Sequence, residues 1–128
     1  MSTESSPTME LIHRFRFEAA HFLPNVPQDH KCRRMHGHSF EAKVVVRGAV
    51  DPSHGWVIDY ADIKRAVAPL REQLDHHLLN EVEGLENPTS ELLALWIWNR
   101  LKPALPQLAE VHIAETCNNA CTYRGEVG

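Results

Sequence analysis

Two histidines with one residue between them, His36 and His38, are the first candidates for chemistry in this sequence. They begin a predicted strand that runs to about Arg47, and alternate strand residues share a face, so the imidazoles would lie about 7 Å apart at the backbone. His21 has the same inward parity on the preceding predicted strand. Three imidazoles with an open fourth position are typical of catalytic zinc; nitrogen ligands disfavour magnesium and calcium but not other transition metals. The alternative is a buried histidine that is hydrogen-bonded in the core.

Cys32 lies shortly before His36, in a loop that also carries Lys31, Arg33 and Arg34. Positive neighbours and a nearby metal lower the pKa of a thiol, which favours a base or nucleophile at neutral pH. Two other interpretations stay open: a fourth zinc ligand in a closed structural site, or a loop thiol without a function. The three cations could recognise phosphates, although a solvated basic loop is the commoner explanation.

Asp75 and His76 follow one another at the end of a predicted helix. A carboxylate bonded to an imidazole fixes its tautomer and supports its charged form, as in general acid–base pairs. Adjacent residues on a regular helix do not face each other. The pair therefore works directly only if the helix has ended or a partner comes from elsewhere; the alternative is that His76 caps the helix.

Glu115 is out of place in a predicted strand, because it shares the inward parity of Val111 and Ile113. An unpaired buried carboxylate is costly, so Glu115 should meet a partner rich in hydrogen-bond donors. A ligand with a flat, amidine-like edge would satisfy it in a bidentate manner, and a structural arginine would do so as well.

Hydrophobic periodicity predicts the elements that must position these residues. The predicted elements are strands over residues 11–21 and 36 to about 47, helices over 60–74 and 90–101, and strands over 110–116 and 120–124. This order indicates an α+β domain, with an antiparallel sheet covered on one face by helices. Residues 1–8 are predicted to be a flexible tail and residues 9–128 a single domain.

The two predicted helices have recognisable N-caps, Asp59 and Thr89. The apolar stripe of the first helix comprises Tyr60, Ile63, Val67, Leu70 and Leu74. Pro69 lies within this helix and should kink it or split it in two, because proline removes a backbone donor and clashes with the preceding turn. The stripe of the second helix comprises Leu93, Ile97 and Leu101.

Composition narrows the classes of function. The 128 residues are 43% hydrophobic and 23% charged, so one ordinary globular core is expected. A net charge of −4 disfavours nucleic acid, and no apolar run is long enough for a membrane span. Nine histidines stand beside only three cysteines. An odd cysteine count without a signal-like segment predicts a cytoplasmic protein, with Cys117 and Cys121 as structural or incidental thiols.

Five motifs, in order over about residues 10–126, together resemble the 6-pyruvoyltetrahydropterin synthase family. They are Phe17-Glu18-Ala19-Ala20-His21, Cys32-Arg33-Arg34-Met35-His36-Gly37-His38, Leu74-Asp75-His76-His77, Asn87-Pro88-Thr89-Ser90-Glu91 and Glu115-Thr116. The short gap between Cys32 and His36 resembles the bacterial branch of the queuosine pathway that forms a carboxy product; biopterin-pathway members have a longer gap.

The resemblance implies a tunnelling fold, in which a four-stranded antiparallel sheet carries two helices on one face. Subunit sheets would then assemble into an oligomeric barrel, with active sites between subunits. The roles that the resemblance implies are Zn²⁺ ligands for His21, His36 and His38, catalytic base for Cys32, acid–base relay for Asp75 and His76, and pterin anchor for Glu115.

The implied reaction is a zinc-dependent cleavage of 7,8-dihydroneopterin triphosphate to 6-carboxy-5,6,7,8-tetrahydropterin, with release of acetaldehyde and triphosphate. The implied partners are a small-molecule pterin and further copies of the chain, with no nucleic acid and no membrane. Two alternatives stay open: a 6-pyruvoyltetrahydropterin synthase, and a non-catalytic, zinc-stabilised assembly that binds a pterin.

Overall fold

The computed structural model describes residues 6–116 and 118–128. Most of the expected tail, residues 1–5, lies outside the described residues. So does Cys117, which was predicted to be a structural or incidental thiol. The strands are β1 (Thr8–His21), β2 (His36–Ala49), β3 (His77–Leu78), β4 (Leu108–Glu115) and β5 (Ala120–Tyr123). The helices are α1 (Tyr60–Leu74) and α2 (Ser90–Leu101), with short 3-10 turns η1 (Lys31–Arg33) and η2 (Leu79–Glu81).

The strands form one sheet in the order β3-β1-β2-β4-β5. The four longer strands pair antiparallel with their neighbours, as predicted. The predicted number of four strands was wrong by one, because β3 adds to the edge of β1 and pairs in parallel, at Ala19 and Ala20. A strand of two residues is too short to produce a hydrophobic period.

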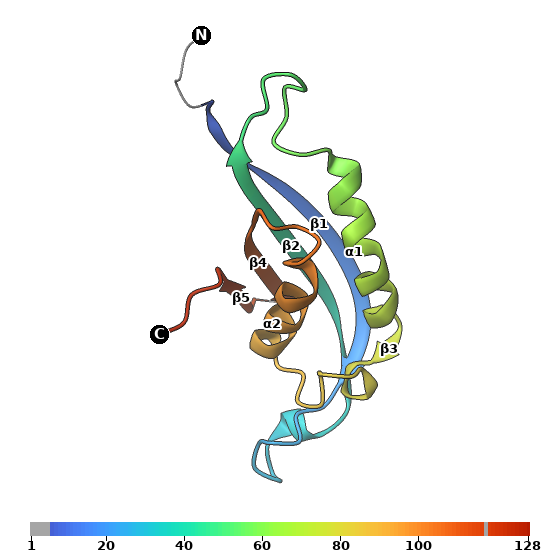
Figure 1. Ribbon diagram of the computed structural model, residues 1–128. Coiled ribbons are helices and arrows are strands. Elements are labelled where there is room, and N and C mark those ends of the chain that lie inside the picture. The colour runs from blue at the N-terminus through green and yellow to red at the C-terminus, as the bar shows by residue number, and fades with distance from the viewer. Residues whose placement is uncertain (1–5, 117) are drawn as a thin grey trace.

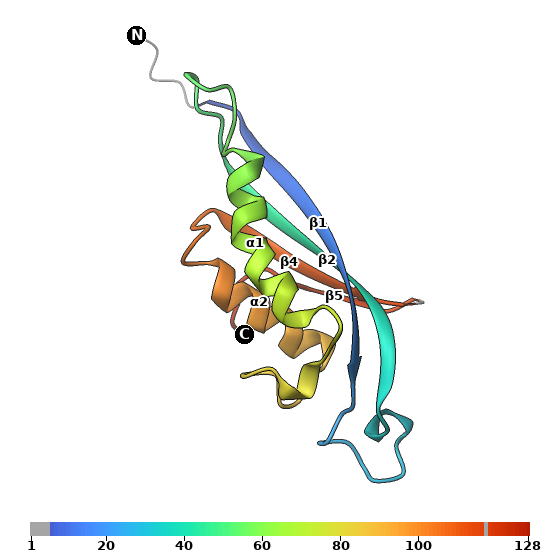
Figure 2. The ribbon, with the colours of Figure 1, turned by 90° about the vertical axis from the view of Figure 1, so that its right-hand side faces the viewer.

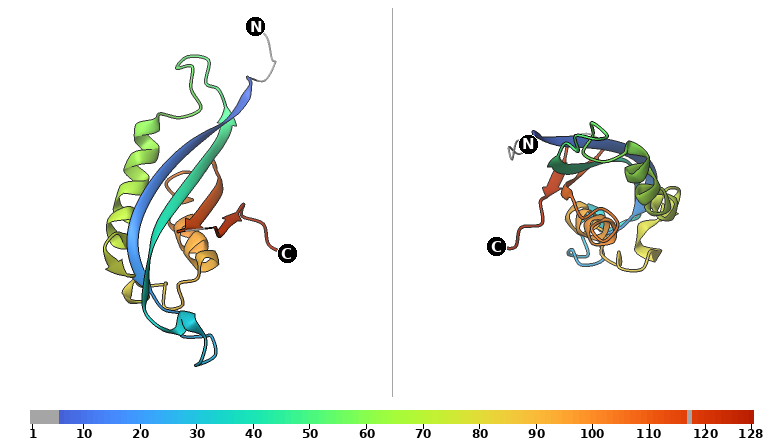
Figure 3. Two further views of the ribbon diagram at one scale, coloured as in Figure 1. Left: turned by 180° about the vertical axis from the view of Figure 1, so that it is seen from behind. Right: turned by 45° about the horizontal axis from the view of Figure 1, so that its top comes forward.

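Both helices lie on the same face of the curved sheet, which confirms the predicted α+β architecture (Figures 1 and 2). The alternating residues Phe15, Phe17 and Ala19 of β1 are buried beneath them, whereas the intervening side chains are exposed. Phe17 stacks on Phe40 of β2 with ring centroids 5.0 Å apart. From behind, the long hairpin of β1 and β2 runs in front, with α1 visible beside β1 and α2 on the side of β2 (Figure 3).

The register of this hairpin decides where the histidines meet. His21, the last residue of β1, pairs with His36, the first of β2, and Ala19 pairs with His38. The loop that joins the two strands projects beyond the sheet at the end opposite the N-terminus (Figure 1). All three histidines therefore lie at that end of the hairpin, beside the basic loop.

Helix α1 begins at the predicted cap, where the Asp59 side chain accepts a hydrogen bond from the Ala61 N–H at 2.9 Å. The buried position predicted for Tyr60 was wrong, and of the two effects predicted for Pro69, a kink or a split, the split does not occur. Tyr60 is 61% exposed, because it precedes the first buried residue, Ile63. Pro69 does not split the helix: its ring lies on the exposed side, while buried residues before and after it hold both halves against the sheet.

Helix α2 follows the prediction closely. Its cap is Thr89, whose hydroxyl accepts from the Leu92 N–H at 3.1 Å, and the predicted stripe of Leu93, Ile97 and Leu101 is fully buried. Within the described residues, no helix is both long and apolar enough to cross a membrane.

Candidate active site

The three predicted metal ligands come together at the end of the hairpin. His21, His36 and His38 each offer a ring nitrogen, and these atoms lie within 4.8 Å of one another. The rings meet edge to face, with centroids 4.5–5.2 Å apart. His21 is 2% exposed, whereas the other two are half-buried. The prediction from strand parity that these three histidines lie together is therefore confirmed.

Backbone carbonyls orient two of these rings. His21 Nδ1 lies 2.9 Å from the Pro88 carbonyl, and His36 Nδ1 lies 2.7 Å from the Arg34 carbonyl. A carbonyl can only accept, so each Nδ1 carries a proton, and in the neutral form of each ring Nε2 presents a lone pair. This is the arrangement of metal-bound histidines, whose second ring nitrogen donates to an oriented acceptor.

The buried Nε2 of His21 has no hydrogen-bond partner within the described residues. An unsatisfied buried nitrogen is costly in a purely structural role. Burial also lowers the pKa of His21, so the ring is neutral and available as a ligand at neutral pH. The residues present thus fit a metal ion, and a satisfied core histidine does not describe this ring.

Cys32 and Glu115 line the same cavity as the three histidines, a space of about 780 Å³. Cys32 is half-buried in η1, where its backbone N–H donates to His30 Nδ1 at 3.0 Å and its carbonyl accepts from the Leu23 N–H at 2.7 Å. Its thiol is placed by the loop and is not among the three residues that cluster as metal ligands.

Glu115 lies at the end of β4, opposite Phe40 of β2. It is half-buried, as its parity suggested. Within the described part of the chain, no arginine or other side chain pairs with its carboxylate, so the structural-arginine alternative is not observed. The carboxylate is left facing the cavity, where a ligand with two N–H donors could meet it.

Asp75 and His76 interact directly, because helix α1 ends at Leu74. His76 Nδ1 lies 3.0 Å from an oxygen of Asp75, and the backbone of His76 is left-handed, with φ 60°. Glu18 of β1 holds this turn: its N–H donates to Asp75 at 2.9 Å and its carbonyl accepts from the His76 N–H at 2.6 Å. The bond from Glu18 is the main cause that lowers the pKa of Asp75.

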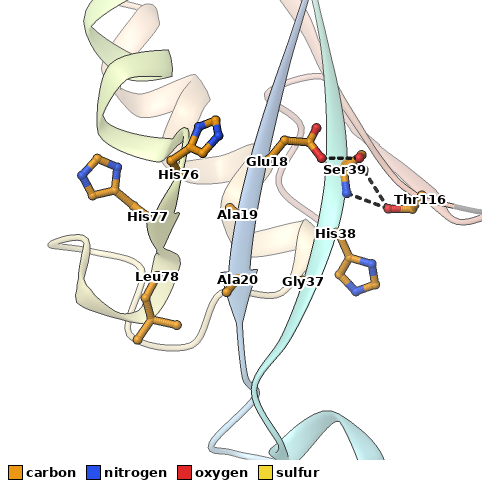
Figure 4. Close-up of a pocket in the computed structure, with 10 residues that line it drawn as sticks. All are labelled: Glu18, Ala19, Ala20, Gly37, His38, Ser39, His76, His77, Leu78 and Thr116. Atoms are coloured by element: carbon orange, nitrogen blue, oxygen red, sulfur yellow. Dashed lines mark hydrogen bonds between the residues drawn. The ribbon is translucent and has the colours of Figure 1, made fainter.

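His76 opens onto a different cavity from Cys32. This second space, about 650 Å³, is lined by His76, Glu18, Ser39 and Thr116 among others (Figure 4). Among the described residues, only His38 lines both cavities. One chain therefore brings the histidine cluster, Cys32 and Glu115 together, and places the Asp75–His76 pair elsewhere.

Two structural supports of the site were missed from the sequence. The Asn80 side chain bonds both the N–H and the carbonyl of Phe22, the residue after His21. The Pro88 carbonyl orients the His21 ring. Asn80 could have been noticed in the sequence, because it lies close to the Asp75–His76 motif. The contact of the Pro88 carbonyl leaves no signal in the sequence, because every residue has a backbone carbonyl.

The fold and the site define an α+β protein in which three histidines, placed to hold a metal ion, line a cavity. Residues 10–126 match the family model described as 6-pyruvoyl tetrahydropterin synthase, so the chain belongs to that enzyme family. The suspected resemblance is confirmed.

Three relatives show the range of the family. The 6-carboxy-5,6,7,8-tetrahydropterin synthase of Synechocystis is 44% identical, over 90% of this chain and 93% of its own. A dihydroneopterin monophosphate aldolase of Pyrococcus furiosus is 36% identical, over 75% and 77%. The solved 6-pyruvoyl tetrahydropterin synthase of Caenorhabditis elegans superposes with a TM-score of 0.89 at 31% identity, over 97% and 100%. This likeness confirms the expected family fold.

Proposed function

We propose that this protein is a zinc-dependent lyase that converts 7,8-dihydroneopterin triphosphate and water to 6-carboxy-5,6,7,8-tetrahydropterin, acetaldehyde and triphosphate. The observation that carries the proposal is one cavity lined by three histidines placed to hold a metal ion, a thiol and an unpaired carboxylate. These are the groups needed to hold a polyhydroxylated side chain, remove a proton from carbon and bind a pterin edge.

The carboxy product is favoured over the alternatives by two observations. The Synechocystis carboxytetrahydropterin synthase is 44% identical, against 36% for the aldolase and 38% for the 6-pyruvoyl tetrahydrobiopterin synthase of Dictyostelium discoideum. The short spacing between Cys32 and His36 also resembles the carboxy-forming branch. This activity would place the protein in queuosine biosynthesis, in the cytoplasm.

Each group in the cavity has a proposed role. The Glu115 carboxylate accepts two N–H donors of the pterin edge and so orients the substrate side chain toward the histidine cluster. The Cys32 thiolate removes the carbon-bound proton. A bound Zn²⁺ supplies Lewis-acid stabilisation of negative charge on the substrate oxygens. His21 and His36 hold their Nε2 lone pairs toward that ion through their bonds to Pro88 and Arg34.

Asp75 and His76 are proposed to act as the acid–base relay in the active site of a neighbouring copy. Their separate cavity supports this, because within one chain the pair does not line the space that holds Cys32 and Glu115. Mixing a Cys32→Ala chain with a His76→Ala chain tests it. Each variant alone should be inactive, and mixed assemblies should regain activity; no recovery would contradict shared sites.

A Cys32→Ala variant separates the lyase from a non-catalytic, zinc-stabilised assembly. Turnover should disappear while the zinc content stays unchanged, because Cys32 is proposed as a base and not as a ligand. Cys121→Ala is the matched control, since this half-buried thiol lies on β5 and lines neither cavity. A loss of zinc from Cys32→Ala, together with an inactive wild-type protein, would favour the structural alternative.

A further inference from the structure

The three cations of the basic loop, Lys31, Arg33 and Arg34, differ in their contacts. Arg33 donates from Nη1 to the carbonyls of Pro24 at 3.0 Å and Val26 at 2.9 Å, so its guanidinium ties the loop to itself. Lys31 and Arg34 are exposed and line the candidate active-site cavity. Within residues 6–116 and 118–128, neither of these two side chains makes a hydrogen bond or a salt bridge. Two unpaired cations therefore face the cavity, and the third does not.

The polar groups of the cavity follow a definite order along β2. Glu115 lies opposite Phe40, and His38 and His36 follow toward the beginning of the strand. Arg34 precedes the strand in an extended backbone conformation. A rise of about 3.3 Å per residue spreads these groups over up to roughly 20 Å. The carboxylate is at one end, the metal centre is in the middle and the cations are at the other end.

We propose that Lys31 and Arg34 form the subsite for the triphosphate group of the substrate, an inference that rests on the proposed function. A pterin triphosphate presents its groups in the same order: an edge with N–H donors, a hydroxylated side chain, and a polyanion at the far end. With the ring at Glu115 and the hydroxyls at the histidines, the polyanion lies at the two free cations.

Electrostatics supports this orientation over the reverse one. The carboxylates that line the cavity are Glu91 of α2 and Glu115 of β4, and both would repel a triphosphate. The chain as a whole carries a net charge of −4, so its overall field does not attract the substrate. Local cations are therefore needed, and arginine binds phosphate oxygens in a bidentate manner.

The test compares two stable probes, neopterin triphosphate and neopterin, whose oxidised rings also report binding by fluorescence. The dissociation constant of neopterin divided by that of neopterin triphosphate measures the contribution of the triphosphate alone. Lys31→Gln and Arg34→Gln should each lower this ratio about tenfold, with little change in the affinity for neopterin. Arg34→Lys should keep part of the ratio, because it retains the charge.

Arg33→Gln is the matched control from the same loop. It should lower the melting temperature and leave the ratio at its wild-type value, because Arg33 bonds backbone carbonyls. An unchanged ratio in both Lys31→Gln and Arg34→Gln, or an equal loss in Arg33→Gln, would overturn the proposal. Turnover of the dihydro substrate is measured separately. Normal turnover with an insensitive ratio refutes the subsite alone, whereas a sensitive ratio without turnover refutes the lyase and leaves the subsite.

Discussion

Replacing Asn80 by alanine should weaken both the fold and the proposed metal site. Its Nδ2 donates to the carbonyls of Phe22 at 2.9 Å and Glu86 at 3.3 Å, and its Oδ1 accepts from the Phe22 N–H at 3.0 Å. Phe22 follows His21 directly, and Glu86 precedes Pro88 by two residues. Asn80 thus joins the strand end that carries His21 to the segment whose carbonyl orients the His21 ring.

The expected magnitude follows from three lost hydrogen bonds. Each contributes about 1 kcal/mol net, and the part-buried Phe22 backbone would be left unsatisfied, so Asn80→Ala should cost about 2–3 kcal/mol. For a chain of this length, that corresponds to a fall in Tm of roughly 10 °C. Because the His21 ring loses its fixed orientation, zinc affinity should also fall by about tenfold.

Urea unfolding followed by circular dichroism, with and without zinc, measures these effects. Asn80→Asp should be intermediate, since it keeps the acceptor for the Phe22 N–H and loses both donors. Asn25→Ala is the control: Asn25 is exposed, and its side chain makes no hydrogen bond within the described residues, so the change should stay within about 0.5 kcal/mol. If Asn80→Ala unfolds like Asn25→Ala, the reasoning is refuted.

Three further predictions concern the proposed relay and anchor. His76→Gly should be more stable than His76→Ala by about 1 kcal/mol in thermal unfolding, because only glycine adopts the left-handed φ of 60° without strain; equal stability would contradict the strain. The lowered pKa of Asp75 stabilises the fold above the unfolded pKa, so the advantage of wild type over Asp75→Asn in urea unfolding should shrink as pH falls below about 4; an advantage that is independent of pH would contradict this. Glu115→Gln should weaken neopterin binding about tenfold in a fluorescence titration, whereas Glu110→Gln, whose carboxylate pairs with Lys43 and Arg124, should not; equal losses would remove the anchor role.

The elements of the fold were predictable because their residues follow a clear period. Alternation in β1 and β2 and the four-residue spacing in α2 gave the right elements and the right buried faces. The exceptions are local. Tyr60 continues the apolar stripe but lies outside the packed region, and Pro69 is tolerated because tertiary packing outweighs one lost hydrogen bond. The strand β3 is too short to carry a pattern.

The part of the site that depends on strand parity was predictable from the sequence. Strand parity placed His21, His36 and His38 together, and marked Glu115 as a carboxylate facing inward. Strand parity does not predict which donor forms a hydrogen bond with which acceptor. The hydrogen bond from His21 to the Pro88 carbonyl depends on how two segments far apart in sequence approach each other. The path of the loop likewise decides that Arg33 bonds the backbone while the other two cations stay free. His76 lies in a separate cavity because the end of α1 is held against β1 by hydrogen bonds to Glu18, which are likewise not visible in the sequence.

The most direct measurement is the mass of the products formed from 7,8-dihydroneopterin triphosphate, with and without a chelator. The proposed lyase should release 6-carboxy-5,6,7,8-tetrahydropterin and acetaldehyde, lose this activity when the metal is removed, and regain it when Zn²⁺ is added. A pyruvoyl product without acetaldehyde would assign the other branch of the family, and an aldolase product would assign a third activity. Formation of the carboxy product at an unchanged rate in the metal-free protein would contradict the role of the three histidines.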